Sequence, residues 1–120
     1  MTKNTELEEI ALNLRKKIIE ISYISKAHHI GSELSCIDIL VSLYFKIMNI
    51  YPKEPTHKDR DYFILSKGHA ALALYTTLMQ RGFFSENFLK DEFLSNGGQL
   101  GGHPDKNLDK GIEISTGSLG

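Results

Sequence analysis

Apolar residues recur at helical spacing near the start of this 120-residue chain, and this pattern restricts the fold more than any other feature. The repeat consists of Leu7, Ile10, Ala11, Leu14, Ile18 and Ile21. Because residues three and four apart share one face of an α-helix, the spacing predicts an amphipathic helix from about Thr5 to Lys26. Thr5, followed by Glu8 three residues later, is typical of a capping box at its start.

A second apolar repeat at helical spacing runs from Ile37 to Met48, and Ser35 and Asp38 are expected to cap it. Between the two predicted helices lies a short loop that carries paired histidines, His28 and His29. After a polar connection containing two prolines, residues 62–65 (Tyr-Phe-Ile-Leu) predict a short buried strand.

The second half of the chain alternates predicted helices with glycine-rich loops. Residues 70–81 are rich in Ala and Leu and predict a helix that ends at Gly82. Ser85 is expected to cap a further short helix to about Leu94. Residues 112–115 are the other candidate for an extended segment, so strands are few and helices dominate.

Composition excludes several classes of function. Fourteen Lys and Arg residues against fifteen Asp and Glu give a net charge of −1, which provides no positive field to attract nucleic acid. The first residues are polar and acidic, unlike a secretory signal, and the chain contains no apolar run of membrane-spanning length. Cys36 is the single cysteine, is expected to be a buried structural thiol, and agrees with a cytoplasmic location.

Residues 66–69 (Ser-Lys-Gly-His) are a candidate anion site because they connect a predicted strand to a predicted helix. Backbone amides at such a junction can bind a phosphate, Gly68 permits close approach, and His69 can donate a hydrogen bond. The alternative is an ordinary turn with a capping histidine, and this motif alone does not decide between them.

Other histidines are candidates for binding or catalysis. His103 lies on a glycine-bounded loop and is either a substrate ligand or a solvent-exposed side chain. At most one of His28 and His29 is expected to be functional, since adjacent residues point in different directions. The histidine and cysteine spacings do not match structural zinc sites, and neither common glycine-rich nucleotide-binding loop occurs.

Five short stretches form an ordered set that is far more specific than any one of them. They are residues 27–31 (Ala-His-His-Ile-Gly), 35–40 (Ser-Cys-Ile-Asp-Ile-Leu), 65–70 (Leu-Ser-Lys-Gly-His-Ala), 102–105 (Gly-His-Pro-Asp) and 115–120 (Ser-Thr-Gly-Ser-Leu-Gly). In this order they resemble the amino-terminal, thiamine-diphosphate-binding region of transketolases, over essentially the whole chain. The resemblance is greatest to the split transketolases, whose cofactor-phosphate and pyrimidine halves are separate polypeptides.

The resemblance implies an α/β fold class: the amino-terminal portion of a thiamine-diphosphate-binding doubly wound fold, mostly helical within this stretch. We therefore expect residues 1–120 to form a single partial domain. The implied reaction is transfer of a two-carbon ketol unit between sugar phosphates in the pentose phosphate pathway. Its implied cofactors are thiamine diphosphate, which carries the difficult chemistry, and Mg²⁺.

Site residues follow from the same resemblance. The implied cofactor-binding residues are Ser66, Gly68, His69, Gly117, Ser118 and Leu119. Among them, His69 would contact the diphosphate, while Gly117 and Leu119 would pack along the cofactor rings. His29 and His103 are expected to be catalytic and to face the substrate channel, where a group that titrates near neutrality can transfer protons.

This chain departs from the commonest family pattern near the predicted channel. His28 replaces a frequent glycine and is expected to reshape the substrate entrance, and Ser118 stands where proline is common. Glu33 is expected to add a negative charge that disfavours phosphorylated sugars.

The family's magnesium ligands would lie beyond Gly120, and the activating glutamate would belong to the pyrimidine half. We therefore expect a fragment that is inactive alone and that acts with a carboxy-terminal transketolase subunit or domain, in a dimer or heterotetramer. Three alternatives remain: a part of a 1-deoxyxylulose-5-phosphate synthase-like enzyme, a part of a dihydroxyacetone synthase-like enzyme, or a non-catalytic interaction module.

Overall fold

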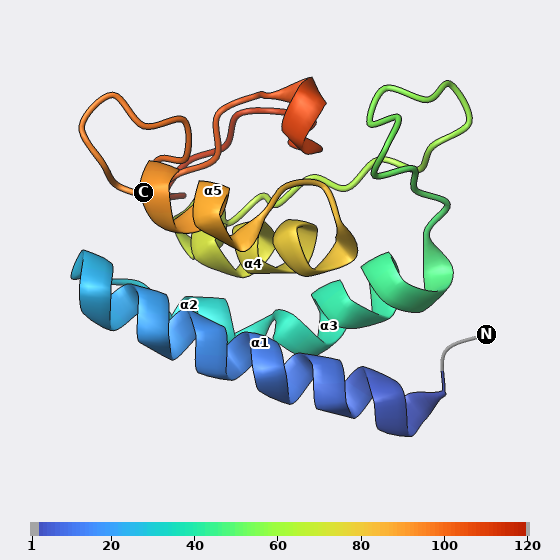
Figure 1. Ribbon diagram of the computed structural model, residues 1–120, viewed down its shortest axis with the longest axis horizontal. Helices are drawn as coiled ribbons and strands as arrows, with labels where there is room; N and C mark the ends of the chain where they lie inside the picture. Colours follow the sequence, from blue (N-terminus) through green and yellow to red (C-terminus); the bar gives the residue numbers. More distant parts are fainter. Residues whose placement is uncertain (1–2, 120) are drawn as a thin grey trace.

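The computed structural model describes residues 3–119, in which five α-helices pack against one another (Figure 1). The helices are α1 (Asn4–Ser25), α2 (Ile30–Ser35), α3 (Ile37–Ser42), α4 (Ala71–Arg81) and α5 (Glu86–Glu92). A π-helix, η1 (Leu43–Ile47), continues α3, and two 3₁₀ turns are η2 (Gly68–Ala70) and η3 (Leu108–Lys110). Figure 1 shows α1 along one side of the molecule and the long loops gathered on the other side of α4.

The predicted first helix is confirmed, and its buried face contains all residues of the apolar repeat except Ile10, which is partly buried. The predicted capping box of Thr5 and Glu8 is wrong. Because α1 begins at Asn4, Thr5 already lies inside its first turn, and Lys3 at the N-cap makes no side-chain capping bond. The helix ends where Lys26 adopts a left-handed φ of 57° and the Ala27 amide donates to the Ser22 carbonyl at 3.1 Å.

The second helical region begins earlier than its apolar repeat indicates. Helix α2 starts at Ile30, directly after the paired histidines, and a break at Cys36 separates it from α3. Ser35 and Asp38 do not cap a helix, contrary to the prediction. The Ser35 hydroxyl instead donates to the Ser32 carbonyl at 2.9 Å, and Asp38 accepts a hydrogen bond from Arg15 at 2.9 Å. Cys36 is buried, as expected.

The predicted strand over residues 62–65 is wrong. The segment is extended but pairs with no neighbouring strand within residues 3–119, and Tyr62 and Ile64 are exposed. Leu65 is the member of this segment that is buried. Residues 112–115 likewise form no strand, and their backbone pairing is an isolated bridge between Asn107 and Ile112. Apolar sequence alone did not distinguish a paired strand from an extended loop.

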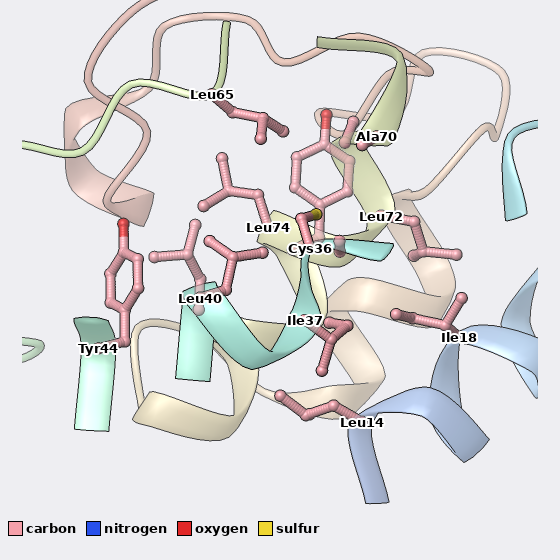
Figure 2. Packing of buried hydrophobic residues seen from close by; sticks show 14 of the residues in the cluster. Leu14, Ile18, Cys36, Ile37, Leu40, Tyr44, Leu65, Ala70, Leu72 and Leu74 are labelled. Carbon is pink, nitrogen blue, oxygen red and sulfur yellow. The ribbon is translucent and has the colours of Figure 1, made fainter. Parts of the chain in front are cut away.

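Helix α4 is the centre of the core, since its residues 71–78 are all buried. Figure 2 shows Leu72 and Leu74 of α4 packed with side chains from α1 and α3, among them Ile18 and Leu40. Gly82 ends the helix with a φ of 105°, as predicted. The predicted cap of the next helix is also confirmed, because Ser85 Oγ accepts from the Phe88 amide at 3.0 Å. Helix α5 ends at Glu92, two residues before the predicted end.

Within residues 3–119, no helix combines the length and the apolar character needed to cross a membrane.

Candidate active site

Three histidines that are far apart in the sequence lie together at one pocket. His29 immediately precedes α2, His69 lies in η2, and His103 lies on the loop after α5. The His29 ring makes an edge-to-face contact with His69, with ring centroids 5.3 Å apart, and its centroid is 6.4 Å from that of His103. The structure therefore brings together the three histidines that were singled out in three separate motifs.

The pocket has a volume of about 110 Å³. Its lining residues are Ala27, His28, His29, Glu33, His69, Phe93, Leu94, Gly102 and His103. His28 borders the pocket, while His29 is the member of the pair whose ring packs against the other histidines.

A buried tyrosine supports the loop that carries His103. Tyr75 of α4 is fully buried, and its hydroxyl donates a hydrogen bond of 2.7 Å to the Gly101 carbonyl. Burial raises the pKa of the Tyr75 hydroxyl well above its ordinary value, so this group remains a donor. The loop is therefore attached to the rigid core two residues before His103.

The His69 imidazole is held by a hydrogen bond to α2. Its Nε2 atom lies 3.0 Å from Ser32 Oγ. Lys67 ties the same helix to the His69 loop, because its Nζ donates to the Ser32 carbonyl at 2.8 Å and to Ser35 Oγ at 3.0 Å. Sequence reasoning missed Ser32, whose contact spans 37 residues of chain, and missed the role of Lys67, although Lys67 lies inside the singled-out motif.

The two loops that the resemblance assigned to the cofactor adjoin each other. Lys67 and Gly117 form a parallel backbone bridge. Gly68 is buried beneath this junction, and a Cβ atom there would lie 2.6 Å from Thr116 Oγ1 and 2.7 Å from the Gly117 amide nitrogen. Gly68 therefore permits the close approach of the 116–117 backbone, which only a residue without a side chain allows.

Two buried polar atoms at this junction lack hydrogen-bond partners within residues 3–119. They are Nδ1 of His69 and Oγ1 of Thr116. Buried groups of this kind are rare in folded proteins and often mark a functional site. The remaining assigned residues, Ser66, Gly117, Ser118 and Leu119, are exposed on the surface of the two loops.

Glu33 is buried, with 2% of its surface exposed, and its environment differs from the expectation of a fixed negative charge. Burial raises the pKa of the Glu33 carboxyl to about 7, and a hydrogen bond from Ser22 only partly opposes this shift. Below that pH the side chain is mainly neutral. Glu33 thus brings to the histidine pocket a group that titrates near neutrality, which its sequence context did not indicate.

Residues 3–119 contain no group of three or more His, Cys, Asp and Glu side chains arranged to hold a metal ion. The charged side chains of α1 and α5 form a surface network away from the pocket. In it, Lys17 and Lys90 both contact Glu20 and Glu86 at 3.0–3.2 Å. Lys17 and Glu20 are therefore members of a surface ion-pair network.

Comparison with known proteins identifies a family and several relatives that are similar over most of this chain. Residues 8–120 match the family model described as transketolase, thiamine diphosphate binding domain. The chain is 46% identical over 106 residues to one subunit of the apulose-4-phosphate transketolase from Phocaeicola vulgatus, and the match covers 88% of this chain and 37% of that protein.

Two further relatives show the same pattern of partial coverage. A 6-deoxy-6-sulfo-D-fructose transketolase subunit from a Clostridium species is 37% identical over 115 residues, covering 96% of this chain and 42% of the relative. A transketolase from Aquifex aeolicus is 34% identical over 118 residues, covering 96% of this chain and 17% of the relative. The chain thus spans less than half the length of these relatives, and its match to the family model extends over nearly all of its own length. It belongs to the family of transketolase thiamine diphosphate binding domains.

Proposed function

We propose that this chain is the part of a transketolase that binds the diphosphate of thiamine diphosphate, and that the complete enzyme transfers a two-carbon ketol unit between sugar phosphates. The observation that carries the proposal is the meeting of His29, His69 and His103 at one pocket, beside the junction of the two predicted cofactor loops. When bound, thiamine diphosphate supplies the nucleophilic carbon and the electron sink for breaking and forming the carbon–carbon bond.

The polar groups at the loop junction fit a cofactor that carries a diphosphate. His69 Nδ1 and Thr116 Oγ1 have unused hydrogen-bonding capacity, which an anionic oxygen would satisfy. Gly68, Gly117, Ser118 and Leu119 form the adjoining backbone, and Ser66 lies at its edge. We assign His69 to the diphosphate and these neighbours to the cofactor-binding loops, with Mg²⁺ held by ligands outside the described residues.

His29 and His103 are assigned to the substrate side of the pocket. Both are exposed there, in contrast to Glu33, so each ring can contact a bound ligand. A histidine donates and accepts protons near neutral pH and hydrogen-bonds to hydroxyl groups. These properties support a role in orienting the substrate hydroxyls and moving protons during ketol transfer.

The relatives' names guide the choice of partner and substrates. Several are named as single subunits of a transketolase, which supports a partnership with a carboxy-terminal transketolase subunit or domain in a larger assembly. Their names mention apulose 4-phosphate and 6-deoxy-6-sulfo-D-fructose, so these sugars are to be assayed beside the pentose phosphate pathway sugars. A cytoplasmic location agrees with sugar phosphate substrates.

The proposal is tested first by calorimetric titration of the chain with thiamine diphosphate and Mg²⁺, with and without a carboxy-terminal transketolase subunit. We expect binding that H69A weakens and H57A does not, because His57 stacks on Tyr51 in a loop that does not border the histidine pocket. In the reconstituted complex, H29A and H103A should each lower the rate of ketol transfer by about 10²-fold. Equal cofactor binding by H69A and H57A would contradict the assignment of His69.

A further inference from the structure

The Glu33 carboxyl is a buried acid at the wall of the histidine pocket. Its residue is 2% exposed, yet it borders the pocket together with all of His28, His29, His69 and His103. The hydrogen bond of this carboxyl within residues 3–119 is with Ser22 Oγ on α1, at 3.5 Å. That is long for a hydroxyl–carboxyl bond, which is ordinarily below 3 Å. Much of the hydrogen-bonding capacity of the carboxyl is therefore unused.

The position of Glu33 is fixed by the fold and not by a flexible loop. It lies in the first turn of α2, next to Ser32, whose carbonyl accepts from Lys67. The Glu33 carbonyl also accepts a hydrogen bond from Cys36 Sγ at 3.5 Å. These contacts hold the backbone of α2 beside the pocket, and the burial of Glu33 leaves its side chain little access to bulk solvent.

The size of the pocket limits what can enter. A volume of about 110 Å³ accommodates a group of a few atoms and not a whole sugar phosphate. The apolar side chains of Ala27, Phe93 and Leu94 make up part of the wall, so an unpaired charge placed there would be poorly solvated. A hydroxyl-bearing, uncharged end of a ligand satisfies both conditions.

We propose that Glu33 is a specificity-determining residue, whose neutral carboxyl donates a hydrogen bond to a hydroxyl group at the uncharged end of a small polyhydroxylated substrate. Above about pH 7 the carboxyl is mainly ionised, and its negative charge would then repel a phosphate group placed beside it. That the ligand is a ketose or its phosphate ester rests on the proposed function. The presence of an acid at the pocket wall and its preference for a neutral hydroxyl group are independent of the proposed function.

The test uses the chain with isotope-labelled histidines and follows the ring resonances of His29 and His103 by NMR. Three probes are titrated: dihydroxyacetone, dihydroxyacetone phosphate and inorganic phosphate. Measurements are made at about pH 6 and about pH 8, on either side of the Glu33 pKa of about 7. E33Q serves as the comparison, since it keeps the four pocket histidines and removes the acid.

We expect dihydroxyacetone to bind at the pocket and to bind roughly fivefold more weakly at the higher pH, the equivalent of one hydrogen bond. E33Q, whose amide donates at every pH, should bind without this additional dependence, and E33L should lose roughly fivefold at the lower pH. E9Q, a substitution at an exposed position of α1, should behave as the wild type.

Tighter binding of inorganic phosphate to wild type than to E33Q at about pH 8 would overturn the inference, as would identical pH dependence of dihydroxyacetone binding in the two proteins. The E33Q result is decisive even when E33L fails to fold. Titration of the same samples with thiamine diphosphate separates the two proposals. If the cofactor does not bind but the Glu33 effect on dihydroxyacetone binding is observed, only the proposed function is contradicted. If the cofactor binds but the Glu33 effect is absent, only this inference is contradicted.

Discussion

Arg60 and Glu113 form a bidentate ion pair that joins segments 53 residues apart. Nε of Arg60 lies 2.8 Å from one carboxylate oxygen of Glu113, and Nη2 lies 2.9 Å from the other. Both side chains are about nine-tenths covered, at 11% and 10% exposure. Such paired geometry is the strong form of an arginine–carboxylate contact, and here it fixes the loop before residue 62 against the segment that leads to residues 116–119.

Replacement of Glu113 by Gln should lower the melting temperature by several degrees, because it leaves the Arg60 guanidinium covered but without its counter-charge. The matched control is E54Q in the same loop, where the carboxylate is 74% exposed and 3.9 Å from His57. Thermal unfolding followed by circular dichroism measures both. Equal shifts for the two variants would show that the Arg60–Glu113 pair contributes no more than a surface contact.

Replacement of Gly68 by Ala should destabilise the fold by about 2 kcal/mol or more, because its Cβ would collide with the Thr116 and Gly117 backbone. G31A is the control. A Cβ atom at Gly31 meets nothing within 4 Å, and alanine inside α2 should raise the free energy of unfolding by up to about 1 kcal/mol. Urea denaturation distinguishes the opposite signs. A stable G68A variant would mean that the 116–117 loop does not pack on η2.

Replacement of Tyr75 by Phe should cost about 1 kcal/mol, the ordinary net value of one hydrogen bond, and should release the loop that carries His103. Hydrogen exchange of the amides near residues 101–103 measures the second effect. Y23F removes a hydroxyl from a side chain that is 86% exposed and should change neither quantity. Unchanged exchange in Y75F would show that the His103 loop is held by other contacts.

Glu33 should make stability depend on pH in the direction opposite to most carboxylates. Its pKa is about 7 in the folded chain against an ordinary value of 4.5, so folding favours its protonated form. The stability associated with this proton is fully present below about pH 4.5 and is lost as the pH rises through about 7.

The difference in unfolding free energy between E33Q and wild type, measured from about pH 4 to pH 8, isolates this contribution. The variant should gain stability relative to wild type as the pH rises through this range. Asp38 and Glu86, whose pKa values are lowered by hydrogen bonds from Arg15 and from Lys90, titrate equally in both proteins and cancel. A difference that is constant with pH would show that Glu33 is ionised normally.

Much of the secondary structure was predictable because it depends on local sequence. The apolar repeat of α1, the Ala- and Leu-rich run of α4 and the Ser85 cap each act over a few residues, and the structure confirms all three. The predicted strand at 62–65 failed for the converse reason. A strand requires hydrogen-bonding neighbours that its own residues do not specify, and within residues 3–119 this segment has none.

The sequence by itself determined the family, through five ordered motifs that place His29, His69 and His103 on three separate segments. Only the tertiary structure decided that these rings share a pocket and that Ser32 hydrogen-bonds to His69. It also decided that Glu33 is a buried acid with a pKa near 7 and not a surface charge. The physical reason is that burial, and contacts between residues far apart in the sequence, depend on how the helices pack. Helix propensity and capping, in contrast, act within a single turn.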